Sequence, residues 1–216
     1  MYKLIAFDLD GTILNTLEDL CDSVNYVLEE FGFPQRTLDE VRCFVGNGVL
    51  KLIERAVPSE TNELTILKVF NRFSEYYLTH SDIKTRPYEG ILGLLNKLKI
   101  RGYKIAVVSN KIHPVVEYLC DKYFPRLIDY CLGDDPIRPK KPHPDMLNYA
   151  MKKLGINKKE TLYIGDSDVD VLTAQNTGVD VIGVEWGFRN RESLINAGAQ
   201  KTVSNPQELL QLLIEE

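Results

Sequence analysis

Two aspartates follow the first apolar run of the chain. The run "YKLIAF" has no helical period and leads directly into Asp8, Asp10 and a turn signal at Gly11, which predicts a strand buried on both faces. A buried charge is costly unless it is paired or bound to a metal, so we expect both carboxylates where the strand opens into a cleft. An Asp–Gly turn or a helix cap would explain Asp10 and Gly11. Neither explains Asp8, which favours a role in binding or catalysis.

Polar side chains also follow three later apolar runs. They are Ser109 and Asn110 in "KIAVVSNK", Lys140 and Lys141 in "RPKKPHP", and Asp166, Asp168 and Asp170 in "YIGDSDVD". Each group alone has an ordinary explanation, namely a helix cap, a solvated loop and an acidic first helical turn. A hydroxyl and free N–H groups between a strand and a helix also favour an anion.

The acidic groups become informative when they are brought together. Two carboxylates about 4 Å apart repel by roughly 4 kcal/mol at an effective dielectric constant near 20. A site that gathers Asp8, Asp10 and Asp166 therefore needs a cation. Oxygen ligands with room for water suit Mg²⁺ better than Zn²⁺. Mg²⁺ beside a hydroxyl, a lysine and free N–H groups is typical of phosphoryl chemistry.

The elements that must position these residues begin with a helical block between residues 15 and 80, in which we expect no strand. Its signals are a helix over 17–31 started by Thr16 and Asp19, a capping box from Thr37 to Glu40, a break at Gly46-Asn47-Gly48, and a helix over 64–77. Apolar residues at helical spacing give both helices one buried face.

After Pro87, strands alternate with helices. The predicted strands are 104–109, 129–133, 161–166 and 180–184. Such alternation indicates right-handed βαβ units and a parallel sheet. The predicted fold class is α/β, a doubly wound, Rossmann-like parallel sheet with a small all-helical cap inserted after the first strand. We assign residues 1–14 and 82–216 to the catalytic core and 15–81 to the cap, with a polar hinge over 79–90.

Composition narrows the classes of function. The 216 residues are 44% hydrophobic with a formal net charge of −5, which excludes a disordered chain and gives no electrostatic case for nucleic acid or an anionic membrane. The four cysteines form no CxxC pair, so we expect buried, reduced thiols. Asp8 comes too early for a secretory apolar region, and no run approaches membrane-spanning length. We therefore expect a cytoplasmic protein whose partner is a small solute.

The motifs "FDLDGT", "VVSN", "KKPHP" and "GDSDVD", in this order, resemble the four motifs of the haloacid dehalogenase superfamily over nearly the whole chain. The helical insertion after the first motif resembles the small cap class of that superfamily. Within it, "FVGNGVLKLIERAV" and "VIGVEWGFRNRESLINAGA" are similar to the cap and C-terminal segments of the phosphoglycolate phosphatase group.

The resemblance implies a role for each motif residue. Asp8 would be the nucleophile that becomes an aspartyl phosphate, and Asp10 would protonate the leaving group and then activate water. Thr12 would brace the loop, and Ser109 with the N–H groups near Leu9 and Asn110 would bind the phosphoryl oxygens. Lys141 would lie between nucleophile and phosphate. It is preferred over its rival Lys140 because it directly precedes Pro142, as the motif lysine of the family does.

The same resemblance implies a Mg²⁺ site. Its ligands would be the carboxylates of Asp8 and Asp166 and the backbone carbonyl of Asp10. Asp170 would lie behind these ligands and orient a bound water. Asp168 falls between the motif positions, and we expect a solvated or capping residue there without a catalytic part.

The remaining polar candidates have weaker signals. His80, His113 and His143 lack paired ligand spacing, so we expect structural or peripheral roles for them. Arg189 and Arg191 could reach the cleft, although arginines in a polar loop are usually solvated. The segment Gly46-Asn47-Gly48 fits equally a helix-breaking turn or a close approach of the backbone to a substrate.

The leading hypothesis is a magnesium-dependent phosphomonoester hydrolase acting through an aspartyl phosphate on a small phosphorylated metabolite such as 2-phosphoglycolate. A dehalogenase is disfavoured because Asp10 supplies an acid. One alternative is a β-phosphoglucomutase-like sugar phosphomutase, which a bisphosphorylated sugar would activate. Another is a signalling receiver phosphorylated on aspartate, against which the helical insertion argues. The sequence shows no heptad repeat or long apolar stripe and leaves the oligomeric state open.

Overall fold

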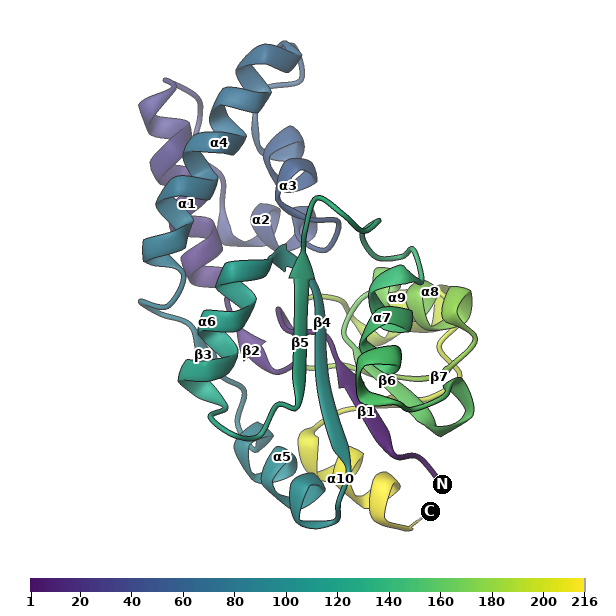
Figure 1. Cartoon of the computed structure of the whole chain (residues 1–216). Coiled ribbons are helices and arrows are strands. Elements are labelled where there is room, and N and C mark those ends of the chain that lie inside the picture. Colours follow the sequence, from purple (N-terminus) through teal and green to yellow (C-terminus); the bar gives the residue numbers. More distant parts are fainter. Residues whose placement is uncertain (216) are drawn as a thin grey trace.

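The computed structural model describes residues 1–215, and its centre is a six-stranded parallel sheet in the order β5-β4-β1-β6-β7-β8 (Figure 1). The strands are β1 (Leu4–Phe7), β4 (Lys104–Ile112), β5 (Tyr130–Asp134), β6 (Thr161–Gly165), β7 (Asp180–Val184) and β8 (Thr202–Val203). All neighbouring pairs in it are parallel. The predicted strands are confirmed, although β4 runs three residues further, and β8 has only two residues and was not predicted.

Alternate residues of β1 enter two different hydrophobic cores. Ile5 and Phe7 pack in the core that also contains α5 (Ile91–Ile100), α6 (His113–Tyr123) and α10 (Pro206–Glu215). Leu4 and Ala6 pack in the other, with α7 (Asp145–Leu154) and α8 (Asp168–Thr177). The remaining helices of this part are α9 (Arg191–Asn196) and the short 3-10 helix η1 (Lys158–Glu160). Helices on both faces explain the apolar run without period and confirm the doubly wound α/β fold class.

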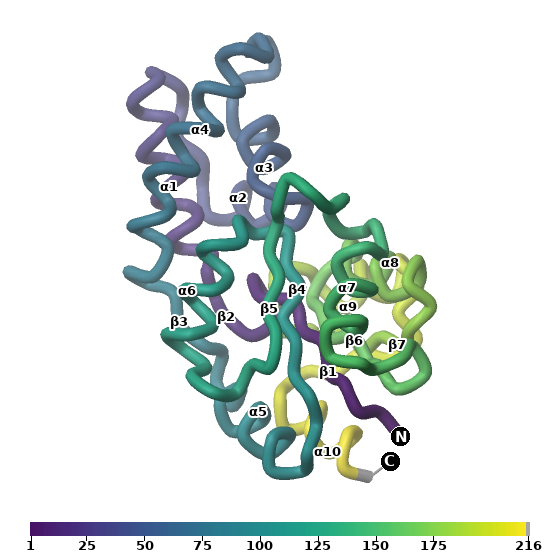
Figure 2. Tube along the Cα trace, in the orientation of Figure 1, coloured from purple at the N-terminus to yellow at the C-terminus, as the bar shows by residue number. Residues whose placement is uncertain are grey.

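Between β2 (Leu14–Asn15) and β3 (Arg86–Pro87) the chain forms four helices: α1 (Leu17–Glu30), α2 (Leu38–Phe44), α3 (Val49–Ala56) and α4 (Glu63–His80). We call them the helical insertion. They pack on one another beyond the carboxyl ends of the strands (Figures 1 and 2). The predicted capping box is confirmed, because the Thr37 side chain accepts from the Glu40 N–H and Glu40 accepts from the Thr37 N–H. The segment 46–48 separates α2 from α3, as expected.

The outgoing and returning segments of the insertion pair with each other. Strand β2 (Leu14–Asn15) runs antiparallel to β3 (Arg86–Pro87), so the prediction of no strand from residue 15 onward is wrong at Asn15. A two-residue strand is too short to show a period of its own. The division at residues 14/15 and 81/82, with its hinge, stays a prediction.

Helix α1 begins directly after Thr16, as the start signal predicts, but the Thr16 side chain forms no capping hydrogen bond. The Thr16 hydroxyl donates to Oδ1 of Asp10 at 2.6 Å. The Asp19 carboxylate accepts from the N–H groups of Lys84 and Thr85 at distances down to 2.8 Å. Both side chains are buried where the insertion meets the sheet. They therefore bind partners distant in sequence, which a local capping rule does not consider.

The cysteine prediction is wrong for one residue. Cys21 and Cys120 are buried and Cys131 is half-buried, but Cys43 is exposed because the only buried residue of α2 is Val41. All four thiols are free. Over residues 1–215, no helix combines the length and the apolar character needed to cross a bilayer.

Candidate active site

Asp8 and Asp10 lie at the carboxyl end of the central strand, as predicted. The Asp8 N–H still donates to the Ile164 carbonyl at 2.9 Å, after which the chain turns at Gly11 with a φ of +83°. A Cβ atom on Gly11 would lie 2.3 Å from Oδ2 of Asp166. The glycine is thus required twice, by its left-handed backbone conformation and by the carboxylate packed against it.

Three buried carboxylates meet beside this turn. Oxygens of Asp8, Asp166 and Asp170 all lie within 4.8 Å of one another. Burial, reinforced by the charge of Asp170, raises the pKa of Asp8 to about 7, and the same two causes raise the pKa of Asp166 well above its ordinary value. The cluster therefore favours a bound cation. Its donors are all carboxylate oxygens, which fits Mg²⁺.

The protein holds Asp166 on two sides. Its Oδ1 accepts from the Thr12 hydroxyl at 3.0 Å, and its Oδ2 accepts from the Phe188 N–H at 2.7 Å. Gly187 leaves space for it, because a Cβ atom there would lie 2.3 Å from the Cβ atom of Asp166. The Trp186 indole N–H donates to the Thr12 carbonyl at 2.9 Å. These contacts match the bracing part expected of Thr12.

Lys141 is the lysine that reaches the cluster. Its Nζ lies 3.0 Å from Oδ1 of Asp8 and 2.7 Å from Oδ1 of Asp170. Lys140 instead pairs with Asp134 at 2.7 Å. The geometry thus favours Lys141 over its rival.

Asp170 has protein partners at both oxygens. Oδ1 accepts from Lys141 and from the Tyr163 hydroxyl at 3.2 Å, and Oδ2 accepts from the Ser167 hydroxyl at 2.6 Å. Asp170 thereby anchors Lys141 to the start of α8. Its predicted part in orienting a water stays a prediction.

Ser109 and Asn110 differ in what their side chains do. Ser109 is buried and lines the pocket. The Asn110 amide donates to the carbonyls of Gly46 (3.1 Å) and Lys141 (2.9 Å) and accepts from the Lys141 N–H (2.8 Å). Its side chain therefore ties two loops together, which leaves its backbone as the part that could bind a phosphoryl oxygen.

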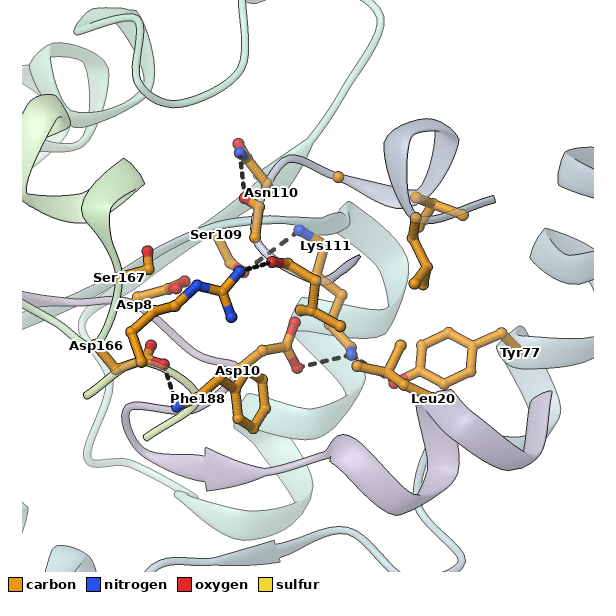
Figure 3. Close-up of a pocket in the computed structure, with 16 residues that line it drawn as sticks. Asp8, Asp10, Leu20, Tyr77, Ser109, Asn110, Lys111, Asp166, Ser167 and Phe188 are labelled. Carbon is orange, nitrogen blue, oxygen red and sulfur yellow. Dashed lines mark hydrogen bonds and ion pairs between the residues drawn. The ribbon is translucent and has the colours of Figure 1, made fainter. Parts of the chain in front are cut away.

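The pocket joins these groups to the helical insertion (Figure 3). One end is polar, and the other is formed by Leu20, Val45, Val49 and Leu52 with Gly46 and Gly48. The cavity measures about 40 Å³, which is room for a few water-sized spheres at roughly 10–15 Å³ each. The glycine segment breaks the helical path between α2 and α3, and Gly46 and Gly48 line the cavity. Its approach to a substrate stays a prediction.

The model of the haloacid dehalogenase-like hydrolase family matches residues 5–184. This chain belongs to that family. A curated relative from Pasteurella multocida, named phosphoglycolate phosphatase, is 37% identical over 199 residues, which cover 87% of each chain. The solved structure of a predicted phosphoglycolate phosphatase from Haemophilus somnus is 30% identical, covers 98% of both chains and has a TM-score of 0.91.

A second solved structure, from Lactobacillus delbrueckii subsp. bulgaricus, is 34% identical, with a TM-score of 0.94 over 100% of this chain and 99% of that one. Together, the family and the relatives show that this haloacid dehalogenase-like hydrolase is an enzyme and a phosphatase. The predicted resemblance is confirmed.

Lys111 of this hydrolase lies in the pocket, although no motif of the sequence predicts it there. Its Nζ lies 2.9 Å from Oδ1 of Asp10 and 2.5 Å from the Tyr77 hydroxyl. Burial alone would lower the pKa of Lys111, but Asp10 and Tyr77 hold it above its usual range. The only available signal was a charged residue directly after Ser109-Asn110 at the end of an apolar strand, where a lysine normally reaches solvent.

Arg189 reaches the cleft, and Arg191 does not. The Arg189 guanidinium donates to the carbonyls of Arg42 (2.7 Å), Cys43 (3.2 Å) and Val45 (2.6 Å) at the end of α2. Arg191 is exposed and lies 3.7 Å from Glu185. Arg189 therefore fastens the helical insertion to the loop that follows β7.

The other candidates lie outside the pocket lining. The Asp168 side chain is 53% exposed and lies 4.0 Å from Arg189. His80 stacks on Tyr76, His113 contacts the Gly133 N–H, and His143 lies near Asp145. Their structural or peripheral roles stay predictions.

Proposed function

We propose that the phosphatase is a magnesium-dependent phosphomonoester hydrolase that acts through an aspartyl phosphate on Asp8, with 2-phosphoglycolate as its substrate. The observation that carries the mechanism is the position of Asp8, paired with Lys141 at 3.0 Å and facing the pocket. The phosphoglycolate phosphatase names of the relatives support the substrate.

The first step forms a bond between a carboxylate oxygen of Asp8 and phosphorus, and it breaks the ester bond. The leaving alkoxide takes a proton from Asp10. In the second step water attacks phosphorus, Asp10 accepts the water proton, and the bond to Asp8 breaks to release phosphate. Lys141 offsets the repulsion between Asp8 and the phosphoryl group.

Hydrogen bonds to one carboxylate oxygen orient Asp10 for these proton transfers. Its Oδ1 accepts from both Thr16 and Lys111, while the second oxygen points toward the middle of the pocket (Figure 3). This orientation suits proton exchange with a leaving group bound there. Ser109 and the backbone N–H groups of Leu9 and Asn110 would bind the phosphoryl oxygens.

The proposed metal ligands are the carboxylates of Asp8 and Asp166 and the backbone carbonyl of Asp10. When bound, Mg²⁺ neutralises the clustered carboxylates and stabilises charge on the phosphoryl oxygens. The protein fixes Asp166 through Thr12 and Phe188, so one ligand is rigid before a metal arrives.

The small, partly apolar cavity favours a small phosphorylated metabolite over a nucleotide. The net charge of −5 gives no support for a nucleic-acid or anionic-membrane partner. The proposed place of action is the cytoplasm, where free thiols stay reduced.

The test is phosphate release from 2-phosphoglycolate, pyrophosphate, sugar phosphates and nucleotides, with Mg²⁺ or with chelator. We expect magnesium-dependent release with 2-phosphoglycolate preferred. Comparable rates on many esters would remove the substrate assignment. Activation by a bisphosphorylated sugar would indicate a phosphomutase, and a stable phosphorylated form without turnover would indicate a signalling receiver.

A further inference from the structure

The cations near the pocket are not equally available to a substrate. Arg189 donates to three carbonyls of the helical insertion. Lys141 is held between Asp8 and Asp170 and does not line the pocket. Among the described residues that line it, Lys111 is the remaining cation.

Lys111 retains a donor for a ligand. An ammonium group has three N–H donors, and two acceptors contact that of Lys111 within residues 1–215, Oδ1 of Asp10 and the hydroxyl of Tyr77. The ammonium also lies 4.5 Å from the centre of the Tyr77 ring. Its side chain is only 2% exposed, so a further hydrogen bond would form in a largely water-free site and would be strong.

The ammonium lies on the leaving-group side of the reaction centre. In the proposed mechanism the phosphoryl group is bound between Asp8 and Ser109, and the leaving oxygen faces Asp10. Lys111 contacts Asp10 and, through Tyr77, helix α4 of the insertion (Figure 3). A group attached to the ester carbon therefore comes within reach of Lys111.

The surrounding wall offers little else to a polar leaving group. On the side of the insertion it consists of Leu20, Val45, Val49 and Leu52 with the backbone at Gly46 and Gly48. Several sugar hydroxyls would lose hydrogen bonds to water against such a wall. One compact anion would also lose water, but the Lys111 ammonium would supply a charge-assisted hydrogen bond in return.

We propose that Lys111, positioned by Tyr77, is the residue that determines specificity by binding a carboxylate on the leaving group. This inference rests on the proposed phosphatase mechanism and extends it. The substrate class it defines is a short phosphomonoester with a carboxylate one carbon from the ester oxygen. Tyr77 is a positioning residue, since it acts through Lys111.

The test compares two esters that differ in the carboxylate, 2-phosphoglycolate and ethyl phosphate, on wild type and Lys111→Met. Because Lys111 also contacts Asp10, Lys111→Met should lower kcat for both esters by the same factor. The ratio of kcat/KM for 2-phosphoglycolate to that for ethyl phosphate should fall in addition by about 100-fold, the size of a hydrogen bond to a charged group, through a rise in KM for 2-phosphoglycolate alone.

Three further variants serve as controls for this hypothesis. Lys111→Arg should keep most of the preference because it keeps the charge. Tyr77→Phe should raise KM for 2-phosphoglycolate alone. Lys104→Met is the matched control, since Lys104 stands at the other end of β4 and pairs with Asp129 at 2.9 Å.

Two outcomes would overturn the proposal while leaving the phosphatase intact. One is an equal loss on both esters in Lys111→Met, which would place its effect on the phosphoryl group or on Asp10. The other is a wild-type enzyme that hydrolyses both esters equally well. Failure of wild type to release phosphate from any ester would instead refute the proposed function.

Discussion

Two buried lysines contact the two aspartates at the end of β1, and their surroundings differ. Lys141 contacts Asp8, Asp170 and Tyr163, which all belong to the sheet and its helices. Lys111 contacts Asp10 and reaches Tyr77 of the helical insertion. The half of the site around Asp8 is therefore complete within the sheet, whereas the half around Asp10 is completed by the insertion. In the proposed mechanism both halves serve the chemistry, through Asp8 and Asp10, and Lys111 of the second half adds the proposed selection among esters.

The largest effect should come from Asp8→Asn, which removes the proposed nucleophile from the first half of the site. This change keeps the shape of the side chain and removes the nucleophilic charge. We expect kcat to fall by about 10,000-fold or more on every ester, with an unchanged circular dichroism spectrum. Wild-type-like hydrolysis would exclude Asp8 as the nucleophile.

Lys141→Met tests the half of the site around Asp8 by removing its positive charge. Removing the lysine leaves Asp8 and Asp170 buried without a counter-charge, so the free energy of unfolding should fall by about 3–5 kcal/mol. Turnover should drop by roughly 1,000-fold, and by the same factor on 2-phosphoglycolate and ethyl phosphate. Urea unfolding and parallel kinetics measure both effects. A loss confined to one ester would mean that Lys141, like Lys111, distinguishes between the two esters.

The stability of the fold should depend on Mg²⁺ and on pH through Asp8, which belongs to the first half of the site. Burial raises the pKa of Asp8 from 3.8 to about 7, so folding without metal favours the protonated acid. The resulting stabilisation is complete below about pH 4 and is lost as pH rises through 7.

Chelated enzyme should therefore have a lower Tm at pH 8 than at pH 5. Mg²⁺ at about 100 times its Kd should add about 2.7 kcal/mol at pH 8, which is roughly 5–10 °C for a chain of this size. The shift should be clearly smaller at pH 5, where Asp8 is protonated. Equal shifts at both pH values would mean that Asp8 is not a ligand.

The smallest effect is expected for Asp168→Asn. The side chain is half-exposed beside the acidic cluster and makes only a 4.0 Å approach to Arg189, which is worth little in solvent. Activity and the concentration of Mg²⁺ for half-maximal rate should stay within about twofold. A large loss of activity, or of affinity for Mg²⁺, would show that Asp168 belongs to the site although it contacts neither Lys111 nor Lys141.

The sequence was informative where parallel strands bring their carboxyl ends together. Asp8, Lys141 and Asp166 could be placed in one site because each directly follows or lies near a strand end of the same sheet. Lys111 could not, since its partner Tyr77 depends on how α4 packs against β4. Nothing in the local pattern of either segment encodes that contact.

Local rules gave the start of α1 but not the partners of the polar side chains there. Thr16 and Asp19 have the residue types of a helix start, yet they bind Asp10 and the returning segment at 84–85. Such long-range partners compete with capping, and burial decides in their favour. Strand β8 could not be predicted for a different reason: its two residues are too few to show a pattern, and they are extended because they pair with β7.

The pairing of β2 with β3 has an evolutionary consequence. It brings residues 15 and 86 together as ladder neighbours, so about seventy residues leave the sheet and return at one point. A segment whose ends are adjacent can lengthen, shorten or be replaced without moving the strands it interrupts. Exchange of the helices would thus change the wall of the pocket while the strands that carry the acidic cluster keep their places.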